Sequence, residues 1–144
     1  MDEGRVLGID YGSTRIGLSL SDPLRIIAQP FRTLINNGTL WSNLKTIVQE
    51  QHIQTVVVGM PLNLKGQKGK KAEEVEQFIE RLKAETKCEV IVWDERFTSS
   101  IAQQTLLDMG TKKSQRRDKG RIDAMAAAVI LQSFLDSTKQ SLSC

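Results

Sequence analysis

Two short apolar segments near the N-terminus constrain the fold of this chain more than any other stretch. Residues 6–10 form an unbroken run of strand length, and residues 16–20 alternate apolar with small side chains. Gly12, Ser13 and Thr14 lie between them and are typical of a tight turn. The pattern predicts two antiparallel strands joined as a β-hairpin.

Asp10 is the unusual residue in this hairpin, because it places a carboxylate at the end of an apolar strand. Burying a carboxylate without a partner is costly. A lysine or arginine, the backbone of an Asx-type turn, or a metal ion would each serve as that partner. Asp10 alone leaves all three open.

The rest of the chain alternates between strand-like and helix-like apolar patterns. Because proline cannot donate to a strand ladder, Pro30 predicts that its strand lies at a sheet edge. Thr39 is expected to cap the first helix. The whole order predicts a mixed sheet with helices on its faces. The expected further strands are 26–34, 53–59 and 89–93, and the expected helices are 40–51, 72–82, 101–109 and 122–135.

Length and charge restrict the class of protein only loosely. The 144 residues fit a single domain, taken as 1–138 with a short tail at 139–144. The net charge of +3 is too small to indicate a nucleic-acid partner by itself. Cys88 and Cys144 form no disulfide framework, and no apolar run is long enough to cross a bilayer. We therefore expect a cytoplasmic protein without a membrane partner.

Acidic residues gather where the elements end. Asp10 follows the first strand, Asp94 and Glu95 follow the fifth, and Asp123 falls in the first turn of the last helix. The carboxyl ends of parallel strands meet at one edge of a sheet. Carboxylates together there would repel one another unless a divalent ion such as Mg²⁺ or Mn²⁺ neutralised them, which indicates phosphodiester chemistry. For Asp123, stabilisation by the helix dipole is the alternative.

A cationic segment at 112–121 directly precedes Asp123 and contains no aromatic side chain. Such runs are usually solvated surface, but this position also favours a clamp on a nucleic-acid backbone. Base stacking is not expected there. The six cations are Lys112, Lys113, Arg116, Arg117, Lys119 and Arg121.

Other motifs fail. Gly69-Lys70 is followed by Lys71 instead of serine or threonine, so the lysine-rich loop is not a P-loop. His52 is the only histidine, and we expect it at the surface near a helix end.

Four motifs together resemble the YqgF family, also called RuvX, whose members are described as Holliday-junction resolvases or as nucleases that mature pre-16S ribosomal RNA. The resemblance implies an RNase H-like fold. It implies a five-stranded mixed sheet of order 3-2-1-4-5, with strand two antiparallel and helices on both faces. The motifs are 8–12 (GIDYG), 58–63 (VGMPLN) with Gly66 beyond, 94–96 (DER) with Thr98, and 122–127 (IDAMAA).

The resemblance also implies an acidic set of Asp10, Glu95 and Asp123 that binds Mg²⁺ or Mn²⁺. Gly12, Asp94, Arg96 and Thr98 would support this set. The wider RuvC-like group has an acid at the end of the fourth strand, where this chain has only Gly59, Met60 and Pro61.

The third acid would therefore come from strand five, roughly 9.6 Å or two ladder spacings from strand one. Reaching across requires the strand end to curl inward. Glu95 is the longer side chain and faces away from Asp94, so it is the expected ligand. Asp94 would then pair with Arg96 or cap a helix near Thr98.

The expected function is metal-dependent hydrolysis of phosphodiester bonds in structured nucleic acid. The expected process is 5′ maturation of pre-16S rRNA, Holliday junction resolution, or both, and a homodimer is compatible with either. A non-catalytic nucleic-acid-binding module is the first alternative. The second is an actin-like or sugar-kinase-related nucleotide-binding protein, since residues 8–12 also resemble the phosphate loop of those proteins. The sequence does not choose between RNA and DNA.

Overall fold

The computed structural model describes residues 4–63, 65–98 and 119–142. The predicted hairpin is confirmed: β1 (Val6–Asp10) pairs antiparallel with β2 (Arg15–Ser21). β2 continues into β3 (Ala28–Ile35), which pairs with it antiparallel and has Pro30 opposite Ser19, beside a register shift. β3 is an edge strand, as Pro30 predicted.

The two remaining strands pair in parallel beside β1. β4 (Thr55–Met60) lies next to β1, and β5 (Glu89–Asp94) lies next to β4. The sheet order is β3-β2-β1-β4-β5. β2 runs antiparallel to both of its neighbours, and the other four strands run in one direction. The predicted order and the antiparallel second strand are both confirmed.

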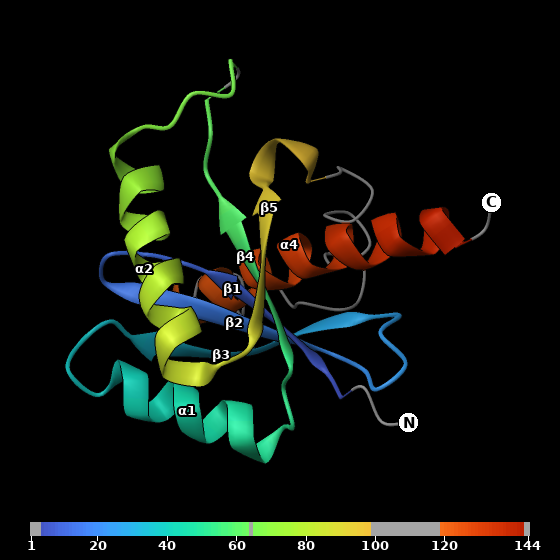
Figure 1. The fold of residues 1–144 in the computed structure, drawn as a ribbon, viewed down its shortest axis with the longest axis horizontal. Helices are drawn as coiled ribbons and strands as arrows, with labels where there is room; N and C mark the ends of the chain where they lie inside the picture. Colours follow the sequence, from blue (N-terminus) through green and yellow to red (C-terminus); the bar gives the residue numbers. More distant parts are fainter. Residues whose placement is uncertain (1–3, 64, 99–118, 143–144) are drawn as a thin grey trace.

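Helices α1 (Leu40–Glu50) and α2 (Lys70–Thr86) cover one face of the sheet (Figure 1). Their apolar stripes pack on the strand residues that point to this face, among them Leu7, Ile9 and Val56. Thr39 occupies the N-cap position of α1, but its side chain makes no capping bond. Its hydroxyl donates instead to Asn37, so the predicted cap is wrong.

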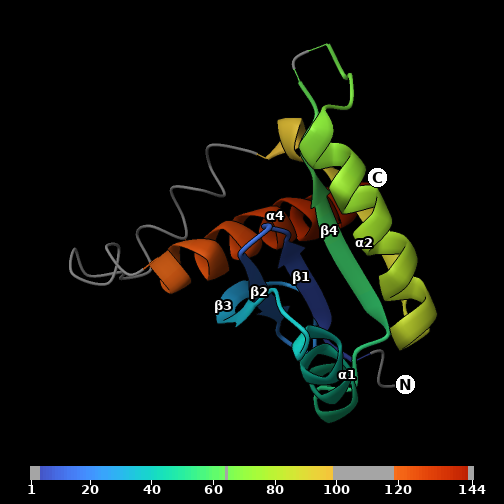
Figure 2. The same cartoon turned by 90° about the vertical axis from the view of Figure 1, so that its left-hand side faces the viewer.

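Helix α4 (Lys119–Leu142) covers the opposite face, so the sheet lies between two helical layers (Figure 2). Its buried residues pack on Val6 and Val57. An added Cβ at Gly8 would lie 2.8 Å from Cβ of Leu131, so this glycine allows the helix to approach closely. The Ser19 hydroxyl donates to the Ala127 carbonyl at 2.8 Å, which fixes the register of helix and sheet.

Helix α4 is longer at both ends than the predicted 122–135. The predicted helix at 101–109 lies outside the described residues. Among the helices that are described, none is long and apolar enough to cross a membrane.

Candidate active site at the carboxyl edge of the sheet

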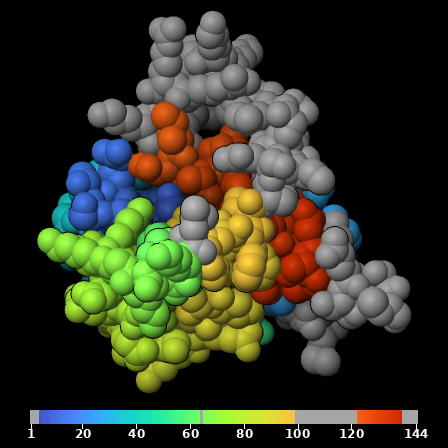
Figure 3. Space-filling view, turned by 90° about the horizontal axis from the view of Figure 1, so that it is seen from above, coloured from blue at the N-terminus to red at the C-terminus, as the bar shows by residue number. Residues whose placement is uncertain are grey.

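The carboxyl ends of the three parallel strands meet at one edge. β1 ends at Asp10, β4 ends at Met60 and β5 ends at Asp94. Viewed from above, the hairpin (blue), the start of α2 (green), the turn after β5 (gold) and the start of α4 (orange) meet around this edge (Figure 3). The sequence-predicted acids therefore come from elements that converge.

Asp10 is the innermost of these acids. It lies opposite Gly17 of β2 and is largely buried. Burial raises the pKa of Asp10 to about 6, and the negative charges of Glu95 and Asp123 act in the same direction. The positive charge of Lys71 opposes them. Asp10 makes no ion pair with any residue that the structure describes, so a lysine or arginine salt bridge is not its partner here.

Glu95 reaches toward Asp10 because the chain turns inward directly after β5. Residues Glu95–Phe97 form the short 3₁₀ helix η1. The Ser133 hydroxyl of α4 donates to the Phe97 carbonyl at 2.9 Å and ties this turn to the helix below. Burial raises the pKa of Glu95, with Asp94 adding to the rise and Lys71 opposing it.

Gly59 of β4 leaves room for the Glu95 side chain to cross. An added Cβ at Gly59 would lie only 3.1 Å from Cγ of Glu95. The inward curl that the resemblance requires is therefore present. A side chain at residue 59 would obstruct the carboxylate that arrives from β5.

Asp94 is engaged elsewhere. Its carboxylate accepts three hydrogen bonds from the Arg96 guanidinium, the shortest at 2.6 Å, and a fourth from the Arg96 backbone N–H at 2.9 Å. The Arg96 side chain holds the pKa of Asp94 below its usual value. The predicted pairing of Asp94 with Arg96 is confirmed, and Asp94 caps η1 instead of a helix near Thr98.

Asp123 lies in the second turn of α4, not in the first as predicted, because the helix begins at Lys119. Gly17 brings it to the edge, since any Cβ at Gly17 would collide with the backbone of Asp123. The Arg15 Nε atom donates to the Asp123 carboxylate at 2.7 Å. Asp123 therefore has a guanidinium partner in this conformation.

The three acids do not form a closed metal cage here. Within the part of the chain that the structure describes, no group of three or more His, Cys, Asp or Glu residues is arranged to hold a metal ion. Asp10 and Glu95 nevertheless fit one half of such a site. They are two oxygen donors held together in a poorly solvated position, each with a raised pKa.

Arg15 and Lys71 are the charged residues that sequence reasoning missed. Arg15 follows the hairpin turn and binds Asp123, while Lys71 follows a loop that failed as a P-loop. The charge of Lys71 acts on both Asp10 and Glu95. The available signal was position: Arg15 directly precedes the second strand of the predicted hairpin, and Lys71 stands at the end of the lysine-rich loop.

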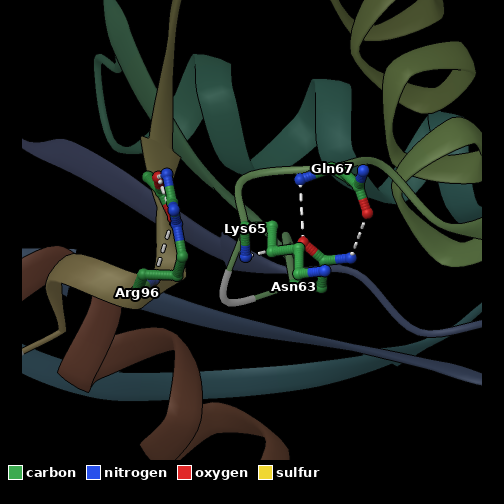
Figure 4. A network of polar contacts seen from close by, with 5 residues as sticks. Asn63, Lys65, Gln67 and Arg96 are labelled. Atoms are coloured by element: carbon green, nitrogen blue, oxygen red, sulfur yellow. Dashed lines mark hydrogen bonds and ion pairs between the residues drawn. The ribbon is translucent and has the colours of Figure 1, made fainter.

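The loop between β4 and α2 is held by its own side chains. The Asn63 carboxamide accepts from the N–H groups of Lys65 and Gln67, both at 2.9 Å, and donates to the Gln67 side chain (Figure 4). Gly66 has φ +78°, and a Cβ there would lie 3.3 Å from the Arg96 guanidinium. The glycine and asparagine of this motif thus shape the loop that leads into Lys70 and Lys71.

The other supporting residues are structural in this conformation. An added Cβ at Gly12 would collide with the Arg15 carbonyl, and the Gly12 carbonyl accepts from Asn36 at 3.0 Å. The Thr98 N–H donates to the Glu95 carbonyl at 3.1 Å and closes η1. Both residues shape the segments that carry the candidate site.

Four cations of the predicted segment 112–121 lie outside the described residues, namely Lys112, Lys113, Arg116 and Arg117. Lys119 and Arg121 belong to the first turn of α4, without described side chains.

The sheet order, the helical layers and the acidic edge define the class: a protein of RNase H-like fold. Two solved structures agree. Thermus thermophilus RuvC in complex with a Holliday junction substrate has a TM-score of 0.63 at 12% identity, with 94% of this chain and 96% of that chain covered. The fowlpox virus Holliday junction resolvase has a TM-score of 0.55 at 11% identity, with 92% and 99% covered.

The sequence comparisons identify the family. The RuvX profile, described as Holliday junction resolvase, matches residues 4–137, and the chain belongs to this family. A relative from Amoebophilus asiaticus, named as a pre-16S rRNA nuclease, is 41% identical over 95% of this chain and 97% of its own length. A relative of the same name from Acetivibrio thermocellus is 44% identical over 92% and 96%. Family membership makes the chain a nuclease, which is a hydrolase.

Proposed function

We propose that this chain is a divalent-metal-dependent nuclease in which Asp10, Glu95 and Asp123 hold Mg²⁺ or Mn²⁺. Its substrate is structured nucleic acid. The names of its relatives support 5′ maturation of pre-16S rRNA, and the description of its family supports Holliday junction resolution. Both substrates belong to the proposal.

The observation that carries the proposal is the approach of Glu95 to Asp10 across Gly59. Two carboxylates in a poorly solvated place destabilise one another, and neither has an ion pair among the described residues. Stability alone gives no reason to keep this pair. A bound divalent cation supplies one, because it neutralises both charges.

When bound, such an ion polarises a phosphate and activates water for attack on a phosphodiester. Asp10 and Glu95 hold the ion from β1 and η1. Asp123 would join them once it released Arg15, whose guanidinium neutralises this carboxylate in the present structure. Arg15 would then be available to contact the substrate.

The cations of the segment 112–121 remain part of the proposal as contacts to the nucleic-acid backbone. They precede Asp123 directly in the chain, so a strand that they bind would pass near the acids. A cytoplasmic location and a homodimer complete the proposal.

The test is cleavage of two substrates by the purified protein in Mn²⁺. One substrate is a synthetic four-way DNA junction, and the other is an RNA that spans the 5′ end of 16S rRNA and its precursor leader. Asp10→Asn should abolish cleavage and weaken Mn²⁺ binding measured by calorimetry. Asp136→Asn, at the other end of α4, is the matched control and should retain both.

The alternatives predict different results. Tight binding of nucleic acid without cleavage by the wild-type protein would favour a non-catalytic binding module. Binding of ATP in place of nucleic acid would favour the nucleotide-binding reading. Undiminished cleavage by Asp10→Asn would remove Asp10 from the site.

A further inference from the structure

A hollow of about 570 Å³ lies beside the acids, between the hairpin turn and the start of α2. Its charged lining consists of Arg15, Lys70, Lys71, Glu74 and Asp123. Arg15 and Asp123 neutralise each other by their ion pair. Two lysines and one glutamate therefore set the charge that a ligand would meet.

The two lysines are exposed, and neither forms an ion pair with a carboxylate among the residues described. They occupy the first two positions of α2, whose N-cap residue Gly69 offers no capping side chain. Helix dipoles favour anions at this end, so two adjacent cations here do not serve the stability of the helix. Two lysines placed against the helix dipole therefore indicate a functional role for their charge.

The position of Lys71 indicates that role. Lys71 lines the hollow together with Asp123, and its charge also acts on Asp10 and Glu95. The volume corresponds to on the order of twenty water molecules. It is suited to a sugar-phosphate unit more than to a single small ion.

We propose that this hollow seats a backbone phosphate of the nucleic acid next to the phosphate that is cut, with Lys70 and Lys71 as its ligands. The inference rests on the proposed function, because it places the hollow beside the reacting position. The two lysines act as positioning residues: they fix the register of the strand against Asp10. Glu74 also lines the hollow and partly offsets the charge of the two lysines.

The experiment compares the wild type with a Lys70→Gln, Lys71→Gln double variant. Binding to the four-way DNA junction and to the precursor RNA is measured in EDTA across a range of salt concentrations. Each lost phosphate contact should make the slope of log K against log salt shallower by roughly 0.7 to 0.9. Between 1 M and 0.1 M salt, the loss in binding caused by each lost contact should therefore grow roughly five- to eightfold.

A second double variant, Lys83→Gln with Lys87→Gln, is the matched control. It removes the same charge from the other end of α2, roughly 20 Å away at 1.5 Å per residue. Its salt slope should equal that of the wild type. An unchanged salt slope in the Lys70, Lys71 variant, or an equal change in both variants, would show that this hollow does not bind a backbone phosphate.

Two further readouts separate this inference from the proposed function. The melting temperature of the Lys70, Lys71 variant should stay close to that of the wild type, because losing the two cations relieves the helix N-terminus but also removes the attraction of Lys71 for Asp10 and Glu95. In Mn²⁺ and at saturating protein, its single-turnover cleavage should also be slower. If the wild type cleaves neither substrate, the proposed function fails. The salt slope in EDTA still shows whether Lys70 and Lys71 contact a backbone phosphate.

Discussion

Gly59 and Glu95 are complementary: the residue without a side chain on β4 provides the space that the carboxylate from the end of β5 occupies. An added Cβ at Gly59 would lie 3.1 Å from Cγ of Glu95 and 2.6 Å from Cδ1 of Ile130. In the proposed metal site, Glu95 from the end of β5 supplies the acid that the end of β4 lacks.

Gly59→Ala should displace Glu95 and so weaken the proposed metal site. We expect cleavage to fall roughly 10- to 100-fold, as for other residues that orient metal ligands. Overpacking against Ile130 should cost about 1–3 kcal/mol of unfolding free energy. Gly38→Ala is the control, since a Cβ there meets nothing within 4 Å. Equal cleavage by Gly59→Ala and the wild type would contradict the prediction.

Glu95→Gln and Asp94→Asn should give opposite results. Glu95→Gln removes a proposed metal ligand, so cleavage should be lost with little change in melting temperature. Asp94→Asn weakens the bonds to Arg96, so the melting temperature should fall while most cleavage remains. Cleavage rates and melting curves of the two variants check this. The reverse pattern would make Asp94 the third acid.

Asp10 should make the metal-free protein less stable as the pH rises. Its pKa is raised to about 6 from 3.8, so the folded state binds more protons than the unfolded state between these values. The free energy of unfolding is therefore highest at low pH, and it falls by up to about 3 kcal/mol as the pH rises through 6. Asp10→Asn should remove most of this dependence and be the more stable protein at pH 7.

Thermal melting in EDTA from pH 4 to 8 measures this effect, with Asp136→Asn as the matched control. Adding Mn²⁺ at pH 7 should raise the melting temperature of the wild type but not that of Asp10→Asn. Identical pH profiles for the wild type and Asp10→Asn would show that burial of Asp10 has no such cost.

Arg15→Gln should strengthen binding of Mn²⁺ in the absence of nucleic acid. The Arg15 guanidinium is paired with the Asp123 carboxylate, so its removal makes this carboxylate available to the ion. The pair is partly exposed and its contribution is correspondingly small, so we expect a gain of up to about fivefold by calorimetry. Arg32→Gln removes an equal charge from β3 and should change nothing. Weaker Mn²⁺ binding by Arg15→Gln would contradict the proposed exchange.

Local patterns in the sequence determined most of the secondary structure and the position of the edge strand. Pro30 excludes a central strand because it has no N–H to donate, and the apolar run of β4 requires cover on both faces. The position of Asp10 at the end of β1 also follows from the sequence pattern, whereas Glu95 lies beyond β5 and is directed by the turn into η1. The order of the strands came from the resemblance of whole motifs to a family.

Only the tertiary structure decided which charged groups meet. Arg15 and Asp123 are 108 residues apart in the chain, and no periodicity connects them. Their contact depends on the close approach of α4 to Gly17. Lys71 likewise comes near Asp10 and Glu95 because α2 begins above the carboxyl ends of β1 and β4. Spacing along a chain records the period of each element, whereas electrostatic partners depend on distances that exist only after the elements pack.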